Sequence, residues 1–257
     1  MSVVKKIFVM LSMCALLVAT FVFGTDIDNR ACAAPDRILR VGVNVGYIPF
    51  SFQTDKQSEI QGFDVDLIKA VAEKMNYKVE FYDYIFDDLI PALNKNEIDV
   101  IVSTMTINDK RKAEISFSEP YFSSGLAIAV SGNSKINSLS ALEGKVIFVG
   151  NGTTSEDIAK TIKDAKILKF EYLADKISII EYWTDAALIT DLPFIRYFSS
   201  SGKNTVGLKI IGKNLTHEEY GIGIRKEDTK LRQEINTALR NLKNSGEYDK
   251  IYDKWFK

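Results

Sequence analysis

The chain has 257 residues, with 33 Lys or Arg against 34 Asp or Glu, a formal net charge of -1 and a hydrophobic fraction of 46%. A hydrophobic fraction of this size at so low a net charge excludes an intrinsically disordered chain, and the charge balance excludes a general nucleic-acid binder, which needs a cationic excess. The single His excludes a metal site made of several His ligands and leaves only one side chain that could act as the base of a catalytic triad.

Residues 1–33 have the pattern of an export signal. Two lysines precede an uncharged, apolar run over residues 7–24, which is typical of a secretory signal peptide. We expect cleavage after Ala33, or earlier after Gly24, and a location in the periplasm or the cell envelope. The run is also about as long as the shortest membrane-spanning helix, and Cys32 is a candidate for lipidation, so a membrane-anchored N-terminus is an open alternative.

After residue 34, short β-branched runs alternate with stretches whose apolar residues recur every three or four positions. The first series, in chain order, predicts a strand over residues 39–45, a helix over 64–75 with Asp64 as its N-cap, a strand over 78–81, a helix over 87–95, a strand over 98–102 and a helix over 109–113. The second series predicts strands over residues 146–149, 168–173, 187–190 and 206–211, helices between them over 153–163, 176–183 and 191–198, and a helical tail over 228–256 interrupted at residues 245 and 246. Alternating strands and helices favour an α/β fold, and the two series favour two lobes, each built on a mostly parallel sheet flanked by helices.

The strongest chemical cluster follows the buried strand expected over residues 98–102. Ser103, Thr104 and Thr106 carry hydroxyl groups, and Arg111 lies in the short helix that comes next. Because open α/β sheets bind ligands at the carboxyl ends of their strands, these groups together with the amides of the helix start predict a receptor for a carboxylate or phosphate. An ordinary capped helix with a solvated Arg explains the same segment equally well.

Three further candidates are weaker. Residues 150–154 form a glycine- and threonine-rich turn between a strand and a helix, where Thr154 could contact a ligand, but a plain turn explains them too. Asp191 follows a strand and could bind an ammonium group, although an Asp at a helix start is more often an N-cap. Tyr47 and Phe86 lie at a strand end and a helix entrance, where aromatic residues stack on ligands or fill the core.

Motifs of common enzymes are incomplete or absent. The stretch over residues 207–214 resembles a P-loop but ends in Asn214, where Mg²⁺ binding needs Ser or Thr. His217 lies in a polar turn and is expected at the surface. We therefore expect no catalytic residue, no metal site and no cofactor.

A series of short motifs runs in order through nearly the whole chain after residue 39. The motifs cover residues 62–67 (GFDVDL), 89–93, 98–100, 105–107, 111–112, 117–121 (FSEPY), 142–146, 152–154, 220–223 (YGIG) and 246–256. In this order they resemble the extracytoplasmic solute-binding proteins of polar amino-acid ABC importers, family 3, and most of all its glutamine-binding branch. Each motif alone is weak, whereas the ordered series is specific.

The resemblance implies a two-lobed periplasmic-binding-protein-like fold (type II) with a two-crossing hinge. One lobe is expected to contain residues 35–124 plus 219–257, and the other residues 125–218. The implied function is capture of a free polar L-amino acid between the lobes and its delivery to the membrane permease of an ABC importer. The protein is expected to be a monomer that performs no chemistry.

By position, the resemblance also assigns the ligand contacts. Arg111 is expected to bind the α-carboxylate, helped by Thr106, Thr154 and the backbone around Thr104. The α-ammonium is expected on Asp191, and the ligand side chain is expected against two aromatic residues, Tyr47 and Phe86.

Two positions depart from the family pattern and leave the identity of the amino acid open. Asn44 stands where many relatives that bind basic amino acids or glutamine carry an acidic residue, which disfavours a Lys or Arg ligand. Gly150 stands where glutamine-binding proteins carry Lys, which disfavours glutamine itself.

Two alternative functions are open on the same scaffold. Some relatives are periplasmic dehydratases of prephenate-type acids, in which Arg111 would hold a substrate carboxylate, but such an enzyme also needs a proton donor at the reacting carbon. The other alternative is the ligand-binding module of a sensor. It is less favoured because the chain ends at Lys257, directly after the last expected helix, although an uncleaved N-terminal anchor would favour it again.

Overall fold

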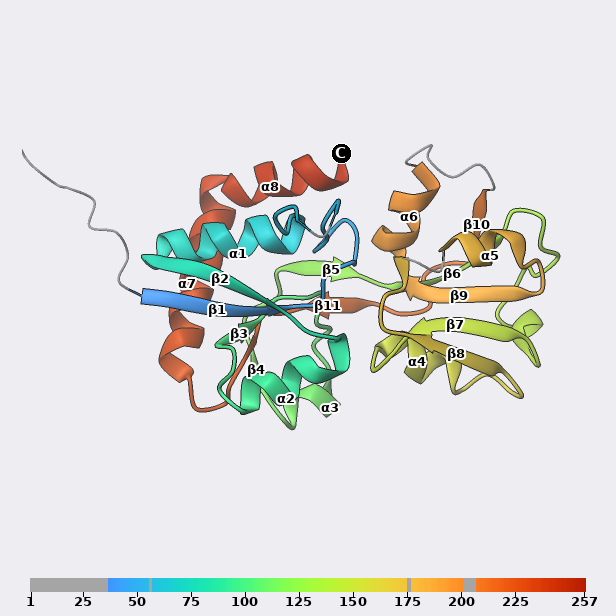
Figure 1. The fold of residues 1–257 in the computed structure, drawn as a ribbon, viewed down its shortest axis with the longest axis horizontal. Helices are drawn as coiled ribbons and strands as arrows, with labels where there is room; N and C mark the ends of the chain where they lie inside the picture. Colours follow the sequence, from blue (N-terminus) through green and yellow to red (C-terminus); the bar gives the residue numbers. More distant parts are fainter. Residues whose placement is uncertain (1–36, 56, 175–176, 201–206) are drawn as a thin grey trace, which may run out of the picture. The chain divides into compact units, whose positions relative to one another are not determined.

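The computed structural model describes residues 37–55, 57–174, 177–200 and 207–257. The predicted export signal, with its cleavage, lipidation and anchoring alternatives, lies outside these residues. No helix in the described part of the chain is long and apolar enough to cross a membrane. Two five-stranded sheets organise the described elements (Figure 1).

The first sheet has the strand order β2-β1-β3-β12-β4. Its strands are β1 (Arg37–Val43), β2 (Tyr77–Asp83), β3 (Val100–Ile101), β4 (Ser116–Phe117) and β12 (Gly223–Ile224). β1 pairs in parallel with β2 and β3, while β12 pairs antiparallel with β3 and β4. Four strands of this sheet therefore run in one direction, and β12 runs against them.

Helices cover both faces of the first sheet. They are α1 (Phe63–Lys74), α2 (Leu89–Asn94), α3 (Asp109–Lys112), α7 (Thr229–Ser245) and α8 (Glu247–Phe256), with the short 3-10 helix η1 (Phe86–Asp88) before α2. Figure 1 shows α1 and α8 on one side of the sheet and α2 and α3 on the other. Strand residues alternate between the two sides, so Val41 and Val43 pack in the cluster that contains α1 and α7, whereas Ile101 packs with Leu89 and Leu93 of α2.

The second sheet has the strand order β10-β6-β9-β7-β8. Its strands are β6 (Leu126–Ser131), β7 (Val146–Gly150), β8 (Lys166–Phe170), β9 (Ala186–Asp191) and β10 (Leu208–Ile211), and its helices are α4 (Thr154–Ala159), α5 (Ile177–Tyr182), α6 (Leu192–Ser200) and the 3-10 helix η2 (Ser140–Leu142). β7 pairs in parallel with β8 and β9, while β6 pairs antiparallel with β9 and β10. Here too, four strands share one direction.

The core of the second sheet explains its continuous apolar strands. Ile147 and Ile189 pack in one buried cluster with Ala159 of α4. Their neighbours Phe148 and Leu188 pack in the cluster on the other face, which contains α5 and α6. Because successive strand residues point to opposite faces, a strand covered on both faces must be apolar throughout.

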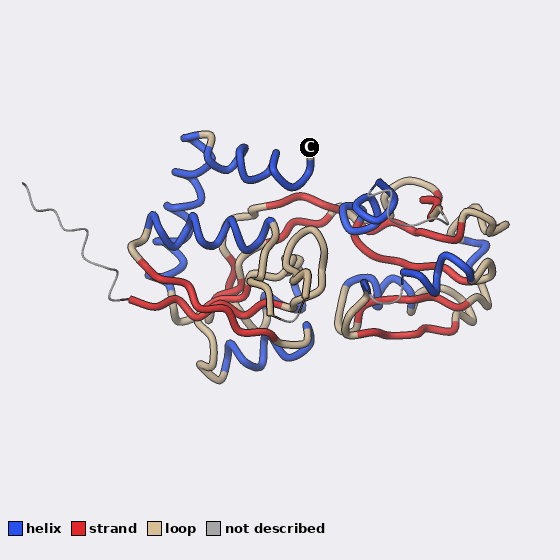
Figure 2. The backbone as a smooth tube through the Cα atoms, turned by 45° about the horizontal axis from the view of Figure 1, so that its top comes forward, coloured by secondary structure: helices blue, strands red, loops and turns tan. Residues whose placement is uncertain are grey.

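A separate two-stranded sheet links the two larger ones. β5 (Phe122–Ser124) pairs antiparallel with β11 (Glu218–Tyr220). β5 leads into β6 of the second sheet and β11 leads into β12 of the first, as the tube in Figure 2 shows. β5 and β11 are thus the two segments in which the chain crosses between the larger sheets. Each is followed by the strand that runs antiparallel to the rest of its sheet, β6 after β5 and β12 after β11. The predicted α/β fold with two mostly parallel sheets and two crossings is confirmed, while the exact lobe boundaries stay a prediction.

Several predicted elements end at other residues than expected. α4 stops at Ala159 instead of Lys163, because its last turn tightens into bonds from the amides of Thr161 and Ile162 to carbonyls three residues earlier. β8 covers residues 166–170 instead of 168–173, since its parallel register against β7 sets its span. The predicted break in the helical tail is confirmed.

The start of α1 also differs from the prediction. Gly62 is the N-cap in place of Asp64, and its φ of 138° lies in a region that L side chains rarely adopt. A Cβ atom at Gly62 would lie 2.0 Å from the carbonyl oxygen of Phe50, so this position requires glycine. Asp64 is instead buried inside the first turn of α1, with its carboxylate directed at Thr104 after β3.

Candidate functional site

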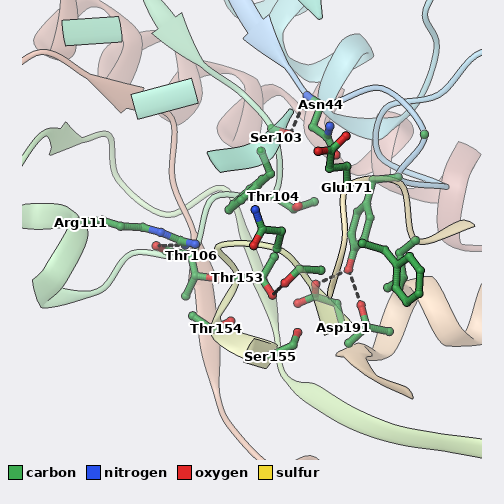
Figure 3. A pocket seen from close by; sticks show the side chains of 18 residues that line it. Asn44, Ser103, Thr104, Thr106, Arg111, Thr153, Thr154, Ser155, Glu171 and Asp191 are labelled. Atoms are coloured by element: carbon green, nitrogen blue, oxygen red, sulfur yellow. Dashed lines mark hydrogen bonds between the residues drawn. The ribbon is translucent and has the colours of Figure 1, made fainter. Parts of the chain in front are cut away.

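One pocket is lined by all nine residues that the sequence predicted as ligand contacts. They are Asn44, Tyr47, Phe86, Ser103, Thr104, Thr106, Arg111, Thr154 and Asp191. They come from the segment after β1, from η1, from the segment after β3, from α3 and α4, and from the end of β9. Figure 3 shows Arg111 and Asp191 reaching the pocket from different sides. The structure therefore brings the predicted residues together, and their roles in binding are taken up below as a proposal.

Arg111 is a buried cation that forms no ion pair with any carboxylate of the described residues. The short helix α3 positions it: the side chain of Asn108 caps the helix by accepting a hydrogen bond from the Arg111 amide (2.9 Å). The guanidinium donates to the carbonyls of Thr106 (2.9 Å) and Gly152 (3.3 Å), and its central carbon lies 5.1 Å from the centre of the Phe86 ring.

The surroundings of Arg111 favour an anionic ligand. The residue is only 7% exposed, and it forms no ion pair with any carboxylate of the described residues. Burial lowers the pKa of Arg111, and the nearby carboxylates, of which Glu218 has the largest effect, oppose that shift. A guanidinium stays charged under such conditions and presents paired donors that match a carboxylate. An incoming carboxylate would supply the missing partner.

Asp191 is held by two tyrosines, Tyr47 from the segment after β1 and Tyr220 from the end of β11. The hydroxyls of Tyr47 and Tyr220 donate to its two carboxylate oxygens. Burial raises the pKa of Asp191 to about 6, and these two hydrogen bonds offset part of that rise. Each carboxylate oxygen can accept a second hydrogen bond, so an ammonium group can bind there as well.

Tyr47 has a position that the sequence did not predict. Its ring stacks on Phe194 of α6 at 4.7 Å between centroids, and its hydroxyl also lies 2.8 Å from that of Thr190. It therefore connects the segment after β1 to the end of β9, in addition to lining the pocket.

The hydroxyls of Thr106 and Thr154 already have a hydrogen-bond partner in this structure. Thr106 donates to Glu218 Oε2 at 2.7 Å and Thr154 donates to the same oxygen at 3.1 Å. Glu218 is 6% exposed, and its carboxylate also accepts from Thr216 at 3.2 Å. A hydroxyl has one proton, so a ligand carboxylate would have to displace Glu218 to receive these donors.

Sequence reasoning missed Glu218, which lies just before the motif over residues 220–223 but belongs to none of the candidate clusters. The antiparallel pairing of β11 with β5 places Glu218 between Thr106, which follows β3, and Thr154, which begins α4. It is the carboxylate that connects the two threonines in this structure.

The backbone amide of Thr104 also has a partner in this structure. Its amide donates to Asp64 Oδ2 at 2.8 Å and is therefore not available to a ligand. Thr104 has a φ of 46°, an unfavourable conformation for a residue with a side chain, and this hydrogen bond helps to hold it. Ser103 has a similar structural contact, because its hydroxyl oxygen accepts from the amide of Asn44 at 3.0 Å.

Asp64 is expected to make the stability of the protein depend on pH. Burial raises the pKa of Asp64 to about 7, and the hydrogen bond from the Thr104 amide offsets part of this effect. Because the folded protein binds this proton more tightly than the unfolded chain, the wild type gains stability at low pH and loses it as the pH rises from about 4 to about 7. Relative to Asp64→Asn, its free energy of unfolding should fall by on the order of 2 kcal/mol between pH 5 and pH 8.

Urea unfolding of the two proteins at both pH values measures this difference. Asp66→Asn serves as a control, since Asp66 lies on the same helix and bonds the side chains of Lys254 and Trp255. Equal pH dependence of wild type and Asp64→Asn would contradict the prediction.

The pocket also contains residues that the sequence did not single out. They are Gly46, Ser155, Phe170, Glu171, Leu173 and Thr190, in addition to Gly150, Asn151 and Thr153 of the turn already noted. Glu171 matters most, because it adds a third charged side chain to the pocket. It follows β8 at a place where the sequence predicted a continuing strand, so no pattern marked it as part of a site.

Comparison with known proteins gives a consistent picture. Residues 39–257 match the family described as bacterial extracellular solute-binding proteins, family 3. The ABC transporter glutamine-binding protein GlnH of Bacillus subtilis (strain 168) is 35% identical over 235 residues, which cover 90% of this chain and 85% of that protein.

Two solved structures are similar over most of the chain. An ancestral arginine-binding protein bound to arginine has a TM-score of 0.81 and 40% sequence identity, covering 87% of this chain and all of its own. The ancestral amino acid-binding protein AncCDT-1, described as a precursor of cyclohexadienyl dehydratase, has a TM-score of 0.78 and 38% identity, covering 86% of this chain and 96% of its own.

Proposed function

Because this chain belongs to the bacterial extracellular solute-binding proteins of family 3, we propose that it captures a free polar L-amino acid and delivers it to the membrane permease of an ABC importer. The observation that carries the proposal is the pairing of opposite charges in one pocket. Arg111 is a buried cation that forms no ion pair among the described residues, and Asp191 is a carboxylate that can accept an ammonium group. An α-amino acid is a zwitterion that satisfies both.

The contacts support a division of roles within the pocket. Arg111 binds the α-carboxylate and Asp191 the α-ammonium, while Phe86 and Tyr47 flank the ligand side chain. Thr106 and Thr154 contribute when the ligand carboxylate displaces Glu218. Charge-assisted hydrogen bonds of roughly 1.5 to 3 kcal/mol each are strong enough to give micromolar binding, about -8 kcal/mol.

Ligand binding favours closure of two lobes in this proposal. One lobe consists of residues 35–124 plus 219–257 and contains Arg111, and the other consists of residues 125–218 and contains Asp191. A ligand held by both residues binds the closed state more tightly than the open one, and only this difference in affinity can shift the equilibrium. β5 and β11, the two crossings, are the natural hinge. The closed, loaded protein is then the form that the permease recognises.

Family membership also bears on the alternatives. The dehydratase alternative is not favoured, because the neighbour related to such an enzyme is itself described as an amino acid-binding protein. The proposal includes export through residues 1–33, with cleavage after Ala33.

The test is calorimetric titration of the purified, ligand-stripped protein with each of the twenty common amino acids. At least one polar amino acid should bind with micromolar or tighter affinity, as for binding energies near -8 kcal/mol. If none binds more tightly than millimolar, the proposed function is wrong.

A further inference from the structure

We infer that the pocket selects an amino acid with a cationic, arginine-like side chain, and that Glu171 is the residue responsible for this selection. The inference rests on the proposed function and makes it more specific. It names a residue that lies outside the motifs on which the family resemblance depends.

The first step is the charge of the pocket. Of its lining residues, three are charged: Arg111, Asp191 and Glu171. The backbone groups of an α-amino acid neutralise the first two, which leaves Glu171. Among the described residues, no Lys or Arg forms an ion pair with Glu171. A ligand whose side chain carries a positive charge would balance it.

The second step is the position of Glu171. The segment that carries it is fixed against both sides of the pocket: the carbonyl of Phe170 accepts from the Asn151 amide at 3.0 Å, and the ring of Tyr172 lies within 3.4 Å of the Cβ position at Gly46. In the view of Figure 3, Glu171 and Asn44 lie together, away from Arg111. This is where the side chain of a ligand bound through its α-carboxylate to Arg111 would end.

The third step is the orientation of the Asn44 amide. Its Nδ2 donates to the carbonyl of Tyr84 at 2.9 Å, which leaves Oδ1 as the hydrogen-bond acceptor for a ligand. Asn44 and Glu171 therefore both offer acceptors. A guanidinium offers only donors and matches them, whereas the carboxamide of glutamine would place its own oxygen near one of them.

The aromatic residues of the pocket favour the same ligand. Tyr47, Phe86 and Phe170 line it, and a planar guanidinium binds well against aromatic rings. Asn44 is uncharged and, taken alone, disfavours a cationic ligand. Glu171, in the segment after β8, supplies the carboxylate that Asn44 lacks.

The test is calorimetric titration of the ligand-stripped protein with L-arginine, L-citrulline and L-glutamine. Citrulline has the shape of arginine, but an uncharged ureido group replaces the guanidinium. The same titrations are made with Glu171→Gln and with the control Glu143→Gln, which changes an exposed glutamate after η2, outside the pocket.

Wild type and Glu143→Gln should bind arginine at least roughly tenfold more tightly than citrulline or glutamine. Glu171→Gln should lose roughly tenfold in affinity for arginine and less than about threefold for citrulline, so that most of the preference disappears. Citrulline or glutamine binding as tightly as arginine to the wild type would overturn the inference, and so would an equal loss for arginine and citrulline in Glu171→Gln. Binding of none of these, nor of any other amino acid, would contradict the proposed function itself.

Discussion

Arg111→Ala is expected to abolish amino-acid binding, with a loss of at least about 100-fold in affinity. Arg111 is the buried cation of the pocket, and its guanidinium is the only described group there that can bind a carboxylate through two parallel hydrogen bonds. Two charge-assisted hydrogen bonds at roughly 1.5 kcal/mol or more each account for that loss. Arg111→Lys keeps the charge but loses the fork geometry, so its affinity should lie between wild type and Arg111→Ala.

The fold should tolerate the removal of Arg111. The side chain makes two hydrogen bonds to backbone carbonyls and no ion pair with a described carboxylate, so its replacement leaves no buried acidic group without a partner. Thermal unfolding without ligand checks this. Arg240→Ala is the matched control, because Arg240 is half exposed on α7 and pairs with Glu119 outside the pocket. Affinity within about threefold of wild type in Arg111→Ala would remove the assigned role.

Asp191→Asn is expected to lower affinity by at least about 100-fold while leaving the unliganded protein as stable as the wild type or more stable. The lost affinity is that of the α-ammonium for a carboxylate. The free energy of unfolding should not fall with the affinity, because burial raises the pKa of Asp191 from 3.8 to about 6. The charged form of Asp191 is therefore disfavoured in the folded protein at neutral pH. An uncharged Asn does not have this cost.

The same shift predicts how ligand affinity depends on pH. As the pH falls through about 6, Asp191 takes up a proton in the unliganded protein, and the ligand ammonium must then displace it. Wild-type affinity should be constant between pH 7 and 8 and fall below pH 6, whereas the weak residual binding of Asp191→Asn should not fall with it. Calorimetry at pH 5, 6, 7 and 8 with a ligand that does not titrate in this range measures both. Equal pH dependence in the two proteins, or full affinity in Asp191→Asn, would contradict the assignment.

The sequence predicts well what depends on local pattern and chain order. The apolar run that ends at Val102 must be a strand covered on both faces, and a polar cluster directly after it must lie at the edge of the sheet. This placed Ser103, Thr104, Thr106 and Arg111 in one site, and the structure brings them into one pocket with Asp191. The break of the helical tail at Gly246 was equally predictable, because glycine commonly ends a helix in the left-handed conformation. Gly246 has that conformation, with a φ of 75°.

The sequence does not predict what depends on long-range pairing. Glu218 bonds Thr106 and Thr154 because β11 crosses beside β5. A crossing at residues 218–219 was expected from the family resemblance, but the contacts of the Glu218 side chain were not. Asp64 looks like an N-cap in sequence, but the Gly before Phe63 takes that place because the chain there passes too close to Phe50 for any side chain. Glu171 enters the pocket because β8 ends early, and this depends on its register with β7.

The most direct measurement is a titration that separates the two charged backbone groups of the ligand. The ligand-stripped protein is titrated with the amino acid that binds most tightly, with its α-carboxamide and with its Nα-acetyl derivative. If Arg111 binds the α-carboxylate and Asp191 the α-ammonium, each blocked derivative should lose at least about 100-fold in affinity. Binding of either derivative as tightly as the free amino acid would contradict capture of a zwitterion between these two residues.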